Sequence, residues 1–203
     1  MPNTFFYLHG FNSDADRSSD KVQILQTIGE VILLSYDSFA TYDNILRSQI
    51  DSVQVDPHEN PVFVGTSLGG FYAAELGKHY GLPSVLINPA WNPYEVLAQF
   101  VGQTLTNYKN GAVKTLERES TESYTDKGFV PDRRNLPLVL LDEGDELLDS
   151  KATREHFTSM RCPVVLFEGG THRFEHMKEA LPHIEEYTRH GVNVTDMTGK
   201  PGL

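Results

Sequence analysis

The chain alternates short apolar runs with segments of helical spacing from one end to the other. The apolar runs are rich in Val, Ile, Leu or Phe and are bounded by Gly, Pro, Asn or Asp, which is typical of parallel strands covered on both faces. We expect six strands, at 4–8, 31–35, 62–64, 84–87, 138–141 and 164–167. Helices are expected at 18–28, 42–55, 68–80, 151–160 and 174–190. This alternation predicts an α/β fold with a doubly wound, mostly parallel sheet.

One segment, 92–135, breaks this rhythm. It begins with a helix-like piece at 94–101 and continues as a polar, charged stretch over 109–134. The segment is either a surface excursion between two strands or a cap over a binding site. We expect a single domain over 1–190 that contains this insertion, followed by a frayed tail at 191–203.

Composition narrows the functional classes. The chain has 203 residues and a net charge of −11, which argues against binding to nucleic acid or to an anionic membrane surface. Its single cysteine, Cys162, begins an apolar run, so we expect a buried and inert thiol and no intrachain disulfide. The sequence shows neither a signal peptide nor an apolar run long enough for a membrane span, so a cytoplasmic location is expected.

The most informative motif is Gly-Thr-Ser-Leu-Gly at 65–69. An apolar run ends at this motif, and a helix-forming stretch follows it directly. Glycines two residues before and two after a serine allow a sharp turn, which presents the hydroxyl at a helix N-terminus. This strand–serine–helix arrangement is the nucleophile elbow of α/β-hydrolases. The pattern predicts that Ser67 is a nucleophile.

A nucleophilic serine needs a base to accept its proton and an acid to orient that base. In this fold the order along the chain is Ser, Asp, His. The predicted base is His172, because it follows the last strand and the flexible pair Gly169-Gly170. His172 and His176 could suggest zinc, but the spacing lacks the metalloprotease pattern and a third ligand, so no metal is predicted.

Three aspartates after the strand at 138–141 compete for the role of the acid. Asp145 follows a glycine turn four residues past the strand end and is the preferred candidate. Asp149 precedes Ser150 and is expected to cap the next helix. Asp142 is expected to be a turn residue, because it lies too close to the strand.

Acyl transfer also needs two backbone N–H groups to stabilise the oxyanion. One is expected from Leu68, directly after the nucleophile, and the other from Phe11 in the loop after the first strand. His9, just before that loop, is expected to order it by hydrogen bonding rather than to act as a base. Phe11, Trp91 and the segment after Trp91 are candidates for the pocket wall. Tyr94, Phe100 and Val101 fit one helical face, so ordinary packing is the better explanation for these three.

Five motifs together give the chain a resemblance to a known family. They are 7–13 (YLHGFNS), 65–70 (GTSLGG), 88–90 (NPA), 144–146 (GDE) and 169–172 (GGTH). On these motifs the chain resembles the small bacterial YqiA/YcfP-like proteins, predicted esterases of the α/β-hydrolase superfamily. The resemblance implies a compact three-layer α/β-hydrolase core that begins at its first parallel strand, and a Ser67, Asp145, His172 triad. The match is weakest around 109–134, in the insertion that the rhythm of the chain suggests as a small cap.

The resemblance also implies a serine esterase or thioesterase that acts on a small-molecule acyl ester or thioester of modest acyl length. No cofactor is expected. The same triad serves acyl transfer to other acceptors and peptide cleavage, which the sequence does not separate. A non-catalytic binding or scaffold protein on a hydrolase fold is the alternative from a different class, and a lost triad member would be its mark.

Overall fold

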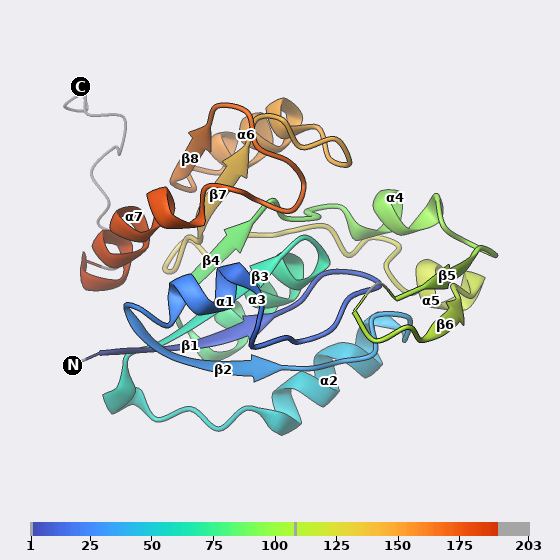
Figure 1. Ribbon diagram of the computed structural model, residues 1–203, viewed down its shortest axis with the longest axis horizontal. Coiled ribbons are helices and arrows are strands. Elements are labelled where there is room, and N and C mark those ends of the chain that lie inside the picture. The colour runs from blue at the N-terminus through green and yellow to red at the C-terminus, as the bar shows by residue number, and fades with distance from the viewer. Residues whose placement is uncertain (1, 108, 191–203) are drawn as a thin grey trace.

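The computed structural model describes residues 2–107 and 109–190 (Figure 1), so the expected tail at 191–203 lies outside the described residues. A six-stranded parallel sheet forms the centre, in the order β2-β1-β3-β4-β7-β8. The strands are β1 (Asn3–Leu8), β2 (Gly29–Leu34), β3 (Pro61–Thr66), β4 (Ser84–Ile87), β7 (Leu138–Asp142) and β8 (Val164–Phe167). All six predicted strands are present, and the α/β fold is confirmed.

The helices cover both faces of the sheet (Figure 1). They are α1 (Asp20–Leu25), α2 (Tyr42–Ser52), α3 (Leu68–Tyr80), α6 (Ser150–Ser159) and α7 (Met177–His190), with a short 3₁₀ turn at Pro57–Glu59. Alternate residues of β1 show the two layers. Phe5 and Tyr7 pack in one core with side chains of α1 and α7, whereas Phe6 and Leu8 pack in the other with side chains of α2, α3 and α6. Side chains alternate in this way because the side-chain period of a strand is two residues.

Three helices are shorter than the sequence predicts. Helix α2 ends at Ser52 rather than at 55, because the backbone of Val53 is already extended. Helix α1 ends at Leu25 because a turn closes with the Ile28 amide bonded to the Leu25 carbonyl, and Gly29 already begins β2. Helix α7 begins at Met177 rather than at 174, and Phe174 has a left-handed backbone, with φ 61°. The three residues before α7 therefore belong to the loop that carries His172.

The insertion between β4 and β7 contains α4 (Pro93–Ala98), a two-stranded antiparallel hairpin of β5 (Thr104–Thr106) and β6 (Val113–Thr115), and α5 (Arg118–Glu122). The polar stretch therefore has secondary structure of its own. Its base is fixed in the core, where the Tyr124 hydroxyl meets that of Tyr72 on α3 at 2.5 Å. The hairpin packs less deeply, and all three residues of β6 are exposed.

Cys162 is buried, with 5% of its surface exposed, in the core beneath α3 and α6. Burial raises the pKa of its thiol to about 12. Because the thiolate is the reactive form, the thiol is unreactive near neutral pH, as the sequence predicts.

Candidate active site

Ser67 lies at a strained turn between β3 and α3. Its backbone has φ 55° and ψ −121°, outside the regions that non-glycine residues ordinarily occupy. Strain of this kind concentrates at functional sites, where the surrounding structure holds it in place. Here the Ser67 amide donates to the Ile87 carbonyl at 2.9 Å, and the Ser67 carbonyl accepts from the amides of Gly70 and Ala90. The turn has the elbow form that the motif predicts.

Two glycines make this turn sterically possible. A Cβ on Gly65 would lie 2.0 Å from the Gly69 carbonyl oxygen, and a Cβ on Gly69 would lie 2.4 Å from the carbonyl oxygens of both Leu8 and His9. Such distances are far inside van der Waals contact, so neither position accepts a side chain. The absence of side chains brings the start of α3 directly against the end of β1. The loop after β1 is thereby placed beside Ser67.

The hydroxyl of Ser67 borders a cavity of about 420 Å³, which His172 also lines. The serine hydroxyl and the imidazole of His172 both belong to the described residues, and no hydrogen bond joins them there. In ligand-free structures the hydrogen bond between nucleophile and base is often long and tightens only with substrate. The two groups therefore share a cavity without a hydrogen bond between them.

The carboxylate of Asp145 contacts the imidazole of His172. The Nδ1 atom lies 2.8 Å from Oδ2 and 3.0 Å from Oδ1. The side chains of Asp145 and His172 are 3% and 16% exposed, so the pair is largely shielded from water. Asp145 Oδ1 also accepts the amides of Leu147 and Leu148, each at 2.9 Å, which fixes the carboxylate. This is the contact that an acid orienting a base would make.

The other two aspartates have different partners. Asp149 caps α6, as expected, because its Oδ1 accepts the Ala152 amide at 2.9 Å. The prediction that Asp142 is a turn residue was wrong. Asp142 is the last residue of β7, is wholly buried, and lies 2.8 Å from Nδ1 of His176. A carboxylate can be buried at the end of a strand when neighbouring groups donate hydrogen bonds to it.

The two histidines whose spacing could suggest zinc therefore each contact a different carboxylate. His172 pairs with Asp145 and His176 with Asp142, each through Nδ1. Across residues 2–107 and 109–190, no three His, Cys, Asp or Glu side chains group as a metal site would require.

The amides of Phe11 and Leu68 are free to donate. Leu68 is the first residue of α3, where an amide has no carbonyl partner within the helix. In the described part of the chain neither amide donates a hydrogen bond. A Cβ on Gly10, next to Phe11, would lie only 3.9 Å from Ser67 Oγ. Both amides therefore lie on backbone adjacent to the nucleophile.

His9 supports the loop after β1. Its Nδ1 lies 2.9 Å from the Gly10 carbonyl oxygen and its Nε2 accepts the Tyr36 amide at 3.4 Å, while its ring stacks on Tyr36 at 4.3 Å. Burial lowers the pKa of His9, which favours the neutral form. Both ring nitrogens are hydrogen-bonded, so His9 orders the loop, as expected from the sequence.

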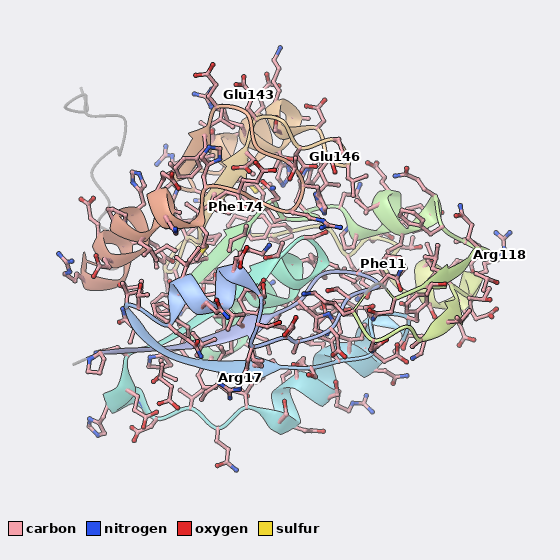
Figure 2. All side chains as sticks on the ribbon, in the orientation of Figure 1. Phe11, Arg17, Arg118, Glu143, Glu146 and Phe174 are labelled. Atoms are coloured by element: carbon pink, nitrogen blue, oxygen red, sulfur yellow. The ribbon has the colours of Figure 1, made fainter. Side chains whose placement is uncertain are left out.

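The cavity wall combines polar and charged side chains with apolar ones, and the apolar side chains come from three separate parts of the chain. Phe11 comes from the loop after β1, Leu148 from the loop after β7, and Val96, Phe100 and Leu105 from the insertion. The loops after β1 and β7 contribute Phe11 and Glu146 to this cavity, and Figure 2 labels both side chains. Phe100 packs on Phe11 with ring centroids 5.6 Å apart, so it serves both packing and the wall.

Trp91 does not line this cavity, contrary to expectation. Its ring stacks on His156 at 3.9 Å and lines a neighbouring cavity of about 220 Å³. The segment after Trp91 supplies the wall instead.

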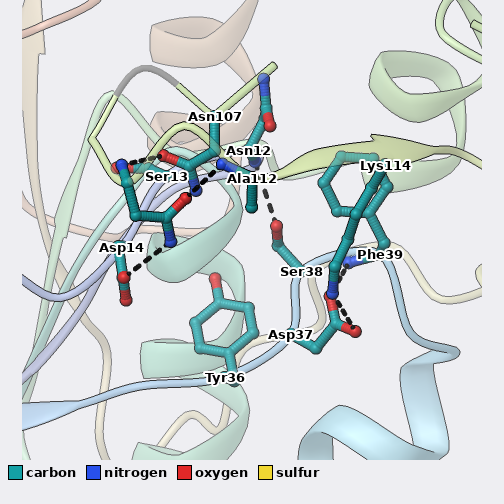
Figure 3. Close-up of a pocket in the computed structure, with 11 residues that line it drawn as sticks. Asn12, Ser13, Asp14, Tyr36, Asp37, Ser38, Phe39, Asn107, Ala112 and Lys114 are labelled. Atoms are coloured by element: carbon teal, nitrogen blue, oxygen red, sulfur yellow. Dashed lines mark hydrogen bonds and ion pairs between the residues drawn. The ribbon is translucent and has the colours of Figure 1, made fainter. Parts of the chain in front are cut away.

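Polar contacts hold the hairpin of the insertion to the loops after β1 and β2, around a small cavity of about 90 Å³ (Figure 3). Asn12 Nδ2 donates to the Thr106 carbonyl at 3.1 Å, and Asn110 Nδ2 donates to Asp14 at 3.0 Å. Lys114 forms an ion pair with Asp37 at 2.7 Å. Since Asn12 is next to Phe11, the hairpin is bonded directly to the loop that carries the free Phe11 amide.

Comparison with known sequences assigns the family. The model of an uncharacterised protein family, UPF0227, matches residues 4–189. The chain belongs to UPF0227. Relatives in this family include a protein of Shewanella sp. strain MR-4, 28% identical over 188 residues that cover 90% of this chain and 97% of the relative. The UPF0227 protein YcfP of Escherichia coli strain K12 is 29% identical over 185 residues, 89% of this chain and 96% of YcfP. The resemblance to YcfP-like proteins is confirmed.

Solved structures confirm the fold of this UPF0227 chain. Mouse alpha/beta hydrolase domain-containing protein 10 is similar with a TM-score of 0.64 and 15% identity, over 92% of this chain and 89% of that one. Polyneuridine aldehyde esterase is similar with a TM-score of 0.62 and 12% identity, over 93% and 98%. At these identities the likeness is one of fold, and the fold is that of the α/β-hydrolases. Among the described residues, no helix is long and apolar enough to cross a lipid bilayer.

The close approach at the elbow predicts the effect of a single methyl group. We expect Gly69→Ala to lower the free energy of unfolding by about 1–3 kcal/mol or more. The reason is that its Cβ would overlap two backbone carbonyl oxygens, those of Leu8 and His9. Chemical denaturation measures this change. Gly128→Ala is the control, since its Cβ would meet only one atom, at 3.9 Å, and it should stay within about 0.5 kcal/mol of wild type. Equal stability of the two variants would contradict the steric account.

Proposed function

We propose that this UPF0227 protein is a serine hydrolase that cleaves carboxylic esters or thioesters of short to medium acyl chains. One observation carries the proposal. A serine on a strained elbow shares a partly apolar cavity with a histidine whose Nδ1 lies 2.8 Å from a buried carboxylate. A nucleophile, a base and an orienting acid in this order are the parts that acyl transfer requires.

In the proposed mechanism Nε2 of His172 removes the hydroxyl proton of Ser67, which attacks the acyl carbonyl. The amides of Leu68 and Phe11 donate to the resulting oxyanion. The Asp145 carboxylate accepts a hydrogen bond from Nδ1–H of His172. This bond keeps Nε2 unprotonated and available as a base, and the carboxylate then stabilises the imidazolium. The imidazolium protonates the leaving alcohol or thiol, and the acyl-enzyme remains. A water molecule, deprotonated by His172, then releases the acid and restores Ser67.

The cavity supports a modest acyl group. Its volume of about 420 Å³ lies near the lower end for small-molecule sites, and the walls from Phe11, Val96, Phe100 and Leu148 suit a hydrocarbon chain. The insertion contributes part of these walls, so in our proposal it acts as a cap within a single hydrolase domain. Its exposed hairpin is the part best suited to move, because few buried contacts hold it.

Two other functions use parts of the same arrangement. Acyl transfer to an acceptor other than water, or peptide cleavage, would use the same three side chains. A binding protein on a hydrolase fold would not need the pairing of His172 with Asp145 or the strain at Ser67. Both observations therefore favour catalysis.

Hydrolysis of a series of p-nitrophenyl acyl esters tests the proposal. We expect Ser67→Ala and His172→Ala to lower kcat by several powers of ten, because the nucleophile or its base is lost. Asp145→Asn should also lower kcat strongly, since the amide no longer selects the correct tautomer. Ser159→Ala, an exposed serine on α6, is the control and should match wild type. Wild-type kcat in Ser67→Ala would rule out Ser67 as the nucleophile.

The same substrates test the apolar wall. Phe100→Ala widens the cavity, so we expect kcat/KM for longer acyl chains to rise several-fold relative to short ones. One methylene group contributes about 1–3 kcal/mol to discrimination in an apolar pocket, which is enough for such a change. Tyr94→Ala is the matched control, because Tyr94 lies on the same insertion and is 40% exposed. An unchanged chain-length profile in Phe100→Ala would exclude this wall from the acyl site.

A further inference from the structure

A second carboxylate binds the loop that carries His172. Asp142, at the end of β7, has no exposed surface. Its Oδ2 accepts the amides of Glu175 at 2.7 Å and Thr171 at 3.2 Å, and its Oδ1 lies 2.8 Å from Nδ1 of His176. Three donors, two of them amides on either side of His172, thus converge on a single buried group.

The backbone is shaped to allow this approach. Gly170 has a left-handed φ of 69°, and a Cβ there would lie 1.9 Å from Asp142 Oδ2. Any side chain at this position would push the loop away from the carboxylate. A buried carboxylate is costly without hydrogen bonds, so Asp142 and its three donors stabilise one another.

Asn88 adds a second set of bonds to the same loop. Its side-chain Oδ1 accepts the Asp142 amide at 2.9 Å, and its Nδ2 donates to the carbonyls of Thr171 at 3.1 Å and His172 at 3.2 Å. Asn88 is 1% exposed and has a strained backbone, with φ 40°. The amide of His172 donates to Glu146 at 2.9 Å. The backbone on both sides of the proposed base is therefore fixed from β4 and from the β7 loop.

We propose that Asp142 and His176, together with Asn88, are positioning residues for His172. The aspartate at the end of β7 and the one that follows the strand have different roles. Asp145 orients the ring of His172, and Asp142 fixes its backbone. His176 supplies the third donor to Asp142 and takes no part in proton transfer to substrate. This inference rests on the proposed hydrolase function, because it gives His172 the role of the base.

Replacing His176 separates its hydrogen bond from its packing. His176→Phe keeps a ring against Phe167, which the imidazole stacks on at 5.3 Å, but removes the donor to Asp142. We expect kcat to fall about 10- to 100-fold with KM little changed, because a displacement of the base near 1 Å has an effect of that size. His176→Asn returns an N–H donor near the Nδ1 position and should recover part of the loss. Asp142→Asn, which keeps the size and one acceptor oxygen, is the second variant if His176→Phe does not fold.

The matched control is His183→Phe. His183 lies on α7 and contacts the same Phe167 ring, at 6.2 Å, without a bond to Asp142. Its kcat should equal that of wild type. An equal fall in both variants would assign the effect to packing and overturn the proposal, as would wild-type kcat in His176→Phe and Asp142→Asn.

A measurement without turnover keeps this test separate from the proposed function. Proton NMR follows the Nδ1 proton of His172, assigned by its loss in His172→Ala. We expect the resonance in wild type and in His183→Phe, and its weakening or shift in His176→Phe. If wild type hydrolyses no ester, the hydrolase proposal fails, and the NMR comparison alone decides whether Asp142 and His176 position His172. An unaltered resonance in His176→Phe would overturn that role.

Discussion

The site depends on one close contact of backbone with backbone, where the start of α3 passes the end of β1. Gly69 lies so near the carbonyls of Leu8 and His9 that only a glycine fits, and Gly65 lies equally near Gly69. This contact forces Ser67 into its left-handed turn and places the loop of Phe11 beside the hydroxyl. The positions of the nucleophile and of the proposed oxyanion donors therefore depend on main-chain packing and not on the side chains of the pocket.

The part of the site that carries His172 is held by hydrogen-bonded carboxylates rather than by close backbone packing. Asp142 is the last residue of β7 and Asp145 follows three residues later, and each carboxylate is paired with a histidine from the loop after β8. Both are nearly or wholly removed from water, which is tolerable only because each accepts several hydrogen bonds. Ser67 on its strained turn and His172 on its hydrogen-bonded loop line the same cavity. Their fixed positions pre-organise the groups that acyl transfer would use.

Much of this could be predicted from the sequence, because the determining signals are local. The six strands follow from apolar runs, and the motif at 65–69 predicts the turn at Ser67 from its glycines alone. The role of Asp142 could not be predicted, since its partner His176 lies 34 residues away and only the parallel pairing of β7 with β8 brings them together. The position of Trp91 was missed for the same reason, because its stacking on His156 of α6 is a tertiary contact. The hairpin in the insertion was also missed, as β5 and β6 are three residues each and mostly polar.

Covalent labelling decides whether Ser67 is an activated nucleophile. A fluorophosphonate reacts with an activated serine and adds a fixed mass, which peptide mass spectrometry assigns to a single residue. We predict one adduct, on the peptide that contains Ser67, and its loss in His172→Ala, where the hydroxyl remains but its base is gone. Folded wild-type protein that stays unlabelled, or that carries the adduct on another serine, would show that Ser67 is not an activated nucleophile.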